Sequence, residues 1–258
     1  MKKLGSLALV AWLTAGVAGA EDFSTGEWVS IFNGENLDGW TPKFAGSALG
    51  ENYRNTFRVE DGLLTASYDE YETFADEFGH LYYEKKLSHY RMRVEYRFLG
   101  EQTPGAPRWA LMNSGIMFHT QDPATIRKDQ PFPVCLEAQM LGDDGERTTG
   151  NLCSPGTHVV MDGNLVTEHC PTTSKVTTPL GEWTRFEIEV HGGELIRHLV
   201  NGEVVTEYSH PTLDDTDADA KALIEGGAPL ELTEGYVALQ AESHRVQFRN
   251  VEVMILKE

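Results

Sequence analysis

Short runs of alternating apolar and polar residues constrain the fold of this chain most, because they recur from Trp28 to the C-terminus with turn residues between them. The run from Tyr90 to Phe98 is an example, since arginine and glutamate alternate there with large apolar side chains. A period of two is typical of a β-strand that has one buried and one solvated face. The sequence therefore predicts an all-β protein made of antiparallel sheets.

The strongest strand signals lie toward the C-terminus. Asn201-Gly202 separates two of them and is the sequence signal of a tight type I′ hairpin. The stretch from Asp217 to Glu225 predicts one short helix, which Gly226-Gly227 ends. The strands expected in this region are Thr184–Val190, Leu195–Val200, Val204–Tyr208, Gly235–Ala241 and Val246–Ile255.

Residues 1–20 have the pattern of a signal peptide. Lys2 and Lys3 precede an apolar run, and Ala18-Gly19-Ala20 supplies the small residues that a signal peptidase needs. The run is shorter than the roughly 20 apolar residues of a spanning helix. We expect a periplasmic or secreted protein whose residues 21–258 form a single domain, with no membrane-spanning segment after leader removal. An uncleaved anchor is the alternative.

The charge of the chain limits its partners. The formal net charge is −19 at pH 7, so phosphate backbones and anionic membrane surfaces would be repelled. Nucleic acid is therefore not expected as a partner, whereas neutral carbohydrate is compatible with this charge. The sequence contains no phosphate loop or dinucleotide fingerprint, so no nucleotide cofactor is expected.

Three cysteines remain after the leader, and an odd number leaves one unpaired. We expect a disulfide between Cys153 and Cys170, which would stabilise the fold by roughly 3 kcal/mol. Cys135 lies in an apolar strand pattern and is expected to be a buried small hydrophobe. The turn-rich excursion from Gly142 to Leu180 is long enough to suggest a functional loop.

Two strands carry the most informative polar residues. In the strand 134–141, Glu137 and Gln139 share a face with Cys135, while the opposite face is entirely apolar and must be core. Polar groups in mid-strand need partners, which suggests a site that faces a ligand. A solvated outer face, or a buried Glu137 paired with an arginine, is the alternative. In the strand 113–121, period two places Met117, His119 and Gln121 on one face.

Histidines could complete such a site. His119 can act as a general base or a metal ligand, or it can be purely structural. The long excursion could bring His158 and His169 over the sheet. Sandwich glycosidases of the laminarinase type carry two carboxylates on one strand, whereas this strand carries only Glu137. Ordinary retaining hydrolysis would therefore need a second carboxylate from another strand.

Four segments taken together resemble the 3-keto-disaccharide hydrolase family, which lies within the concanavalin-like jelly rolls. They are FNGENLDGW at 32–40, NSGIMFHTQ at 113–121, CLEAQML at 135–141, and a tail containing LVNGEVV and GYVALQAESHRVQFRNVEV. Their order and spacing span essentially the whole mature chain. The resemblance implies a concanavalin-like jelly-roll β-sandwich of two antiparallel sheets that cleaves glycosides oxidised at C3 of the glucose ring.

A ketone at C3 acidifies the C2 proton, so one base can remove it and expel the C1 substituent by β-elimination, after which water can add to the enone. This route needs a single base and suits the single Glu137. The resemblance implies that Glu137 and His119 serve as base and acid or as metal ligands, although many members have Arg where this chain has His119. The residues expected to bind substrate are Gln139, Gln121, His158, Gln240 and His244.

Two further expectations stay open. A divalent metal ion could stabilise the enolate, but no ligand spacing in the sequence demands one. The concanavalin-like fold also serves non-catalytic carbohydrate-binding modules, so a binding module is the alternative function.

Overall fold

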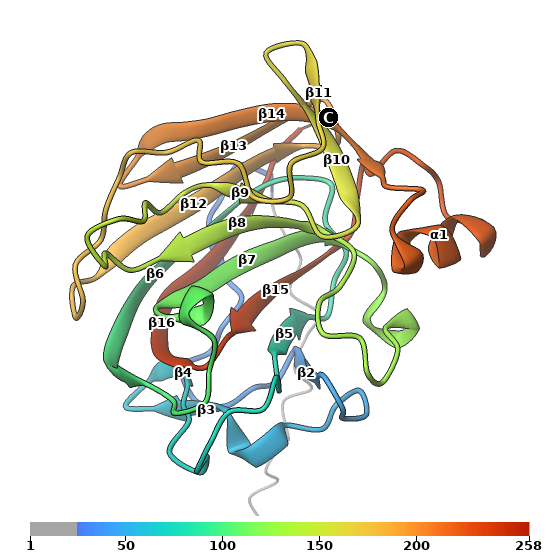
Figure 1. Cartoon of the computed structure of the whole chain (residues 1–258). Coiled ribbons are helices and arrows are strands. Elements are labelled where there is room, and N and C mark those ends of the chain that lie inside the picture. The colour runs from blue at the N-terminus through green and yellow to red at the C-terminus, as the bar shows by residue number, and fades with distance from the viewer. Residues whose placement is uncertain (1–24, 258) are drawn as a thin grey trace, which may run out of the picture.

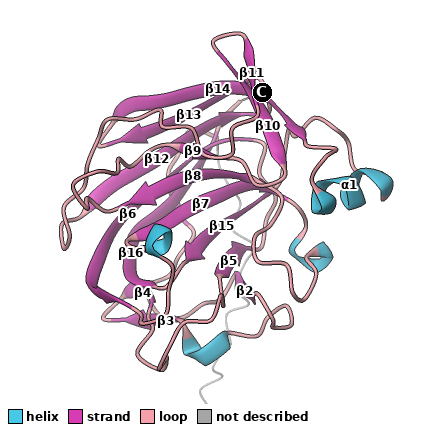
Figure 2. Cartoon of the chain, viewed as in Figure 1, coloured by secondary structure: helices cyan, strands magenta, loops and turns pink. Residues whose placement is uncertain are grey.

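A computed structural model describes residues 25–257 of the chain. Two antiparallel β-sheets pack face to face, and helices lie only at the periphery (Figures 1 and 2). The predicted jelly-roll β-sandwich is confirmed. The expected signal peptide lies outside the described residues. Within the described range, no helix has the length and apolar character needed to cross a membrane.

The larger sheet has ten strands. Its strands are β1 (Val29–Ser30), β3 (Phe57–Glu60), β4 (Leu63–Ala66), β6 (His89–Gln102), β10 (Thr157–Met161), β11 (Asn164–Val166), β12 (Thr184–His191), β13 (Leu195–Val200), β14 (Glu203–Leu213) and β16 (His244–Ile255). They are ordered β11-β10-β14-β13-β12-β6-β16-β4-β3, and β1 also pairs with β16.

The smaller sheet has six strands and carries the site described below. Its strands are β2 (Trp40–Phe44), β5 (Gly79–Tyr83), β7 (Asn113–Thr120), β8 (Leu136–Leu141), β9 (Leu152–Cys153) and β15 (Tyr236–Ala241). They are ordered β2-β5-β15-β7-β8-β9. Three short 3₁₀ turns span Tyr53–Asn55, Arg108–Ala110 and Pro123–Thr125.

One continuous hydrophobic core fills the space between the sheets. Most strands contribute alternate residues to it, as the period-two pattern predicts. In β8 the apolar face formed by Leu136, Ala138 and Met140 is fully buried in this core. Glu137 and Gln139 are thereby directed to the outer face of the six-stranded sheet.

Local signals near the C-terminus are confirmed. Asn201 and Gly202 both have positive φ, 51° and 89°, as a type I′ turn requires, and they join β13 to β14. The predicted helix is α1 (Ala218–Glu225), and the carboxylate of Asp217 caps its first turn by accepting from two backbone N–H groups. It lies beside the sandwich, outside both sheets (Figure 1).

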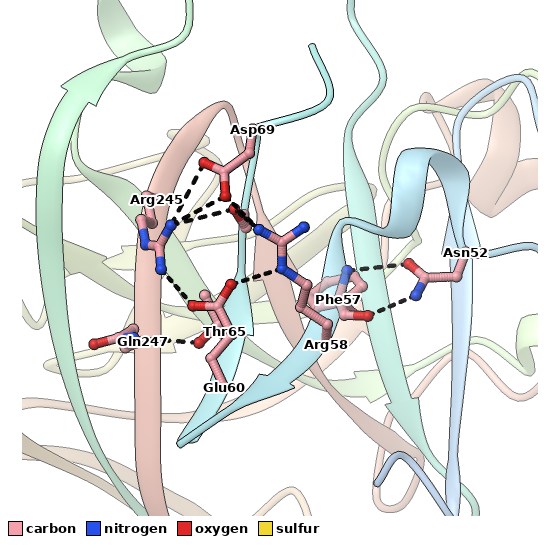
Figure 3. A network of polar contacts seen from close by, with 9 residues as sticks. Asn52, Phe57, Arg58, Glu60, Thr65, Asp69, Arg245 and Gln247 are labelled. Carbon is pink, nitrogen blue, oxygen red and sulfur yellow. Dashed lines mark hydrogen bonds and ion pairs between the residues drawn. The ribbon is translucent and has the colours of Figure 1, made fainter. Parts of the chain in front are cut away.

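Ion pairs occupy much of the outer face of the ten-stranded sheet. Arg58 of β3 donates to Glu60 over 2.7 Å, and Arg245 of β16 also donates to Glu60, while both arginines contact Asp69 (Figure 3). Similar pairs link Arg93 to Glu252 and other strand neighbours along the sheet. These contacts satisfy the charged side chains of this face with one another.

Candidate active site

A cavity of about 580 Å³ lies on the outer face of the six-stranded sheet. Its volume is within the range of small-molecule sites. Glu137 and Gln139 of β8 and Asn113 of β7 contribute to its lining, together with Glu242, which directly follows β15. The excursion after Gly142 supplies much of the remaining wall, including Arg147. The cavity therefore joins sheet residues to the long loop.

Glu137 is almost completely buried, with 5% of its surface exposed. It pairs in register with Met117 of β7 and with Cys153 of β9. A Cβ on Gly115 would lie only 2.6 Å from Oε1 and 2.7 Å from Cγ of Glu137, so glycine at this position makes room for the carboxyl. Burial raises the pKa of Glu137 to about 8.

Glu242 is a second buried carboxyl in the cavity that the sequence analysis missed. The signal was available, because Gln240 and Glu242 alternate with the core residues Leu239 and Ala241 just as Glu137 and Gln139 alternate with core residues in β8. Burial, and then the nearby charge of Glu137, raise the pKa of Glu242 well above its ordinary value.

Several polar atoms on this face lack partners. Among residues 25–257, no hydrogen-bond partner is found for Glu137 Oε1, Glu242 Oε2, both amide atoms of Gln240, His80 Nε2 and Asn113 Oδ1. We call these the open polar atoms. His80 pairs with Gln240 across β5 and β15, and burial lowers the pKa of His80 to about 3, so its ring stays neutral. Buried polar groups are normally satisfied, so this cluster is typical of a ligand site.

Aromatic side chains form one wall. Trp109 is 51% exposed and lines the cavity, and its indole stacks on Phe78 with ring centroids 5.4 Å apart. Phe132 also lines the cavity and packs against Phe78 at 4.8 Å. An exposed indole with its other face supported is a rigid apolar surface on which a sugar ring can stack.

The expected disulfide is present between Cys153 and Cys170, and both residues line the cavity. Because Cys153 stands opposite Glu137 in the sheet, the disulfide fixes the wall segment next to the carboxyl. Cys135 is unpaired and fully buried beside Met117, as expected.

His119 does not share the face of Glu137, so its expected placement is wrong. Its φ is +47°, and the register between β15 and β7 shifts at this end of the strand, which breaks the period-two alternation. The ring instead lies 2.9 Å from the carbonyl oxygen of Gly192, in the β12–β13 hairpin of the other sheet. Burial lowers the pKa of His119 to about 4. His119 connects the two sheets rather than lining the cavity.

Three other expected substrate-binding residues also lie elsewhere. Gln121 accepts hydrogen bonds from the Gln130 side chain and the Val134 backbone, so it orders the loop between β7 and β8. His244 belongs to β16 of the ten-stranded sheet and packs edge-on against Phe98.

His158 of β10 lies 3.3 Å from Asp214 in an adjoining cavity of about 300 Å³. Phe132, Pro155 and His169 line both cavities, so the two adjoin each other. Of the residues expected to form the site, the structure therefore brings together Glu137, Gln139 and Gln240 on one face.

The side chains of the described residues do not support a metal site. In the part of the chain that the structure describes, no three His, Cys, Asp or Glu side chains are grouped so as to hold a metal ion.

Comparison with known proteins agrees with this fold and indicates the family. The family model of the 3-keto-alpha-glucoside-1,2-lyase-like domain matches residues 27–254. The chain belongs to this family. A relative from Bacteroides thetaiotaomicron, named 3-keto-disaccharide hydrolase, is 24% identical over 252 residues, which cover 89% of this chain and 78% of the relative.

Solved structures share the fold of this family member. A Parabacteroides distasonis protein described as a "putative glycosyl hydrolase" aligns with a TM-score of 0.55 and 20% identity, covering 89% of this chain and 94% of that one. A Bacillus subtilis protein of unknown function with a galectin-like fold aligns with a TM-score of 0.53 and 12% identity, covering 92% and 100%. At these identities the structures support the fold alone.

Proposed function

We propose that this protein cleaves 3-keto-glycosides, with Glu137 as the base that removes the C2 proton. The observation that carries the proposal is the buried carboxyl of Glu137, which has an open polar atom in a cavity of sugar size. Membership of the 3-keto-alpha-glucoside-1,2-lyase-like family supports the reaction, and the name of the Bacteroides relative supports a 3-keto-disaccharide as the substrate class.

The environment of Glu137 suits proton abstraction next to a ketone. Its raised pKa makes the carboxylate a stronger base than an exposed one, and general-base catalysis is most efficient when the pKa of the base lies near the working pH. The side-chain amide of Gln139, which lines the cavity, can donate to the oxygen on which enolate charge develops. Gln240, on the same face, is fully buried and keeps an open amide nitrogen. The neutral ring of His80 beside it adds no positive charge that would lower the basicity of Glu137.

The cavity walls suit a carbohydrate. Trp109 offers an exposed aromatic surface for the apolar face of a sugar ring. Gln139 lines the cavity two residues beyond Glu137 on the same strand and can bond hydroxyl groups. These contacts would orient the ring with C2 toward Glu137.

A second candidate is direct hydrolysis of an unoxidised glycoside by two carboxyl groups. Glu242 favours it, because an acid and a base or nucleophile that flank the bond are what ordinary glycosidases require. This route needs no ketone at C3. A binding module without catalysis is less well supported, because the family to which the chain belongs is described by a lyase reaction and the Bacteroides relative is named a hydrolase.

Incubation of the purified protein with α- and β-linked 3-keto-glucosides tests the proposal. Aglycone release and the ultraviolet absorbance of an enone would be followed together. We expect turnover by the wild type and at least a roughly 10²-fold loss in Glu137→Gln. Full activity of Glu137→Gln, with an unchanged melting temperature, would remove Glu137 from the mechanism.

A further inference from the structure

The carboxyls of Glu137 and Glu242 interact electrostatically in one cavity. Both line the same cavity, and each contributes an open polar atom. Each is at most 5% exposed. The guanidinium of Arg147 lowers the pKa of Glu242, but less strongly than burial and the charge of Glu137 raise it. Two like charges in one buried site oppose each other's ionisation.

We propose that Glu242 is a second catalytic residue, and that the Glu137–Glu242 pair holds one proton, with Glu137 as the base and Glu242 as the acid that protonates the leaving oxygen. This inference rests on the proposed function. It assigns to Glu242 the acid role that the sequence analysis considered for His119, which lies against Gly192 instead.

The elimination step balances with this pair. The Glu137 carboxylate takes the C2 proton, and the electron pair of the C2–H bond passes to the C3 ketone as an enolate. The ketone then re-forms as the C1–C2 double bond forms and the C1–O bond breaks. Glu242 gives its proton to the departing oxygen, so an enone and a neutral alcohol result. Glu137 is now protonated and Glu242 ionised.

Addition of water reverses these roles. The oxygen of water bonds to C1, the Glu242 carboxylate takes a proton from it, and Glu137 returns a proton to C2. One water is consumed, and both carboxyls recover their initial states. The pair is thus reset within the cavity when hydration follows elimination, so that the net reaction is hydrolysis.

The leaving group provides the test. A 3-keto-glucoside with a sugar or alkyl aglycone needs protonation of its leaving oxygen, whereas a 4-nitrophenyl aglycone does not. We expect Glu242→Gln to lower kcat/KM by about 10²- to 10³-fold for the substrate with a sugar or alkyl aglycone. For the 4-nitrophenyl substrate the loss should be less than about 5-fold. Glu137→Gln should lower both equally. Glu207→Gln is the matched control, since Glu207 lies outside the cavity and pairs with Arg197 on the exposed face of the ten-stranded sheet.

The possible results separate the two claims. No turnover of either keto-glucoside by the wild type overturns the proposed function, and this inference with it. Turnover by the wild type, with equal losses for both aglycones in Glu242→Gln or no loss for either, overturns the role of Glu242 alone.

A second measurement uses the wild type and does not depend on the folding of a variant. Infrared spectroscopy should show a protonated carboxylic acid band at pH 7. Absence of that band would overturn the shared proton.

Discussion

Burial opposes ionisation of Glu137 in the folded protein, so the free energy of unfolding is expected to depend on pH. Its pKa is about 8 in the fold against an ordinary 4.5. Because the folded-state pKa is raised, the stabilising contribution of the protonated carboxyl is complete below the ordinary pKa and is lost as pH rises through about 8. The carboxyl of Glu137 is therefore expected to reduce stability at alkaline pH.

Glu137→Gln keeps the shape of the side chain and removes its charge. We expect this variant to exceed the wild type in free energy of unfolding by about 1–3 kcal/mol at pH 9, and to differ little at pH 5. Urea unfolding at the two pH values measures both differences. The same difference at both values would contradict the raised pKa.

His119 is expected to stabilise the fold and to take no part in catalysis. His119→Ala removes the buried contact to Gly192 between the two sheets. We expect a loss of about 1–3 kcal/mol in free energy of unfolding, with kcat/KM unchanged at temperatures where the variant is folded. His191→Ala, which removes a partly exposed contact to Glu189, is the control. A large loss of kcat/KM in folded His119→Ala would return this residue to the site.

These residues show how far the sequence could predict the site. Glu137 and Gln139 were found because period two holds through β8 and its opposite face is wholly apolar. His119 was misplaced because a positive φ and a register shift interrupt the alternation, and neither has a sequence signal at a non-glycine residue. Glu242 was missed although the same alternation, continued past Ala241, would have found it.

At the scale of elements, close packing between β7 and β8 fixes the position of the carboxyl. Gly115→Ala would place a methyl group against Glu137 and force its side chain to move. Since misplacement by about 1 Å can cost 10²-fold in rate, we expect kcat/KM to fall by about 10- to 100-fold.

Circular dichroism of Gly115→Ala should remain that of the wild type. Gly226→Ala, at the end of α1, is the control, because its nearest contact is 3.3 Å away at helix backbone. Unchanged kinetics in folded Gly115→Ala would mean that Glu137 is not held as the structure indicates.

At the scale of the whole molecule, the strand pattern and the family resemblance predicted the two-sheet sandwich, because alternation is imposed by the shared core. Which sheet carries the site could not be read from the sequence. It follows from tertiary pairing, which brings β15 next to β7 from more than 100 residues away.

The location of the protein in the cell concerns the whole chain. We propose that residues 1–20 are a cleaved leader and that residues 21–258 form the mature domain, placed in the periplasm or outside the cell. Expression of the full gene product in a bacterium, followed by intact mass measurement of the exported protein, should give a chain that begins at Glu21. A membrane-bound product that retains residues 1–20 would instead support the anchor.

The proposed cleavage in this cavity depends on a ketone at C3. One 3-keto-glucoside and the same compound after reduction of its ketone to the alcohol would be given to the wild-type protein at equal concentration. We predict aglycone release from the ketone and release from the alcohol at least about 10³-fold slower, since loss of the ketone removes the acidity of the C2 proton. Equal release from both compounds would contradict the elimination mechanism and leave direct hydrolysis by two carboxyls in its place.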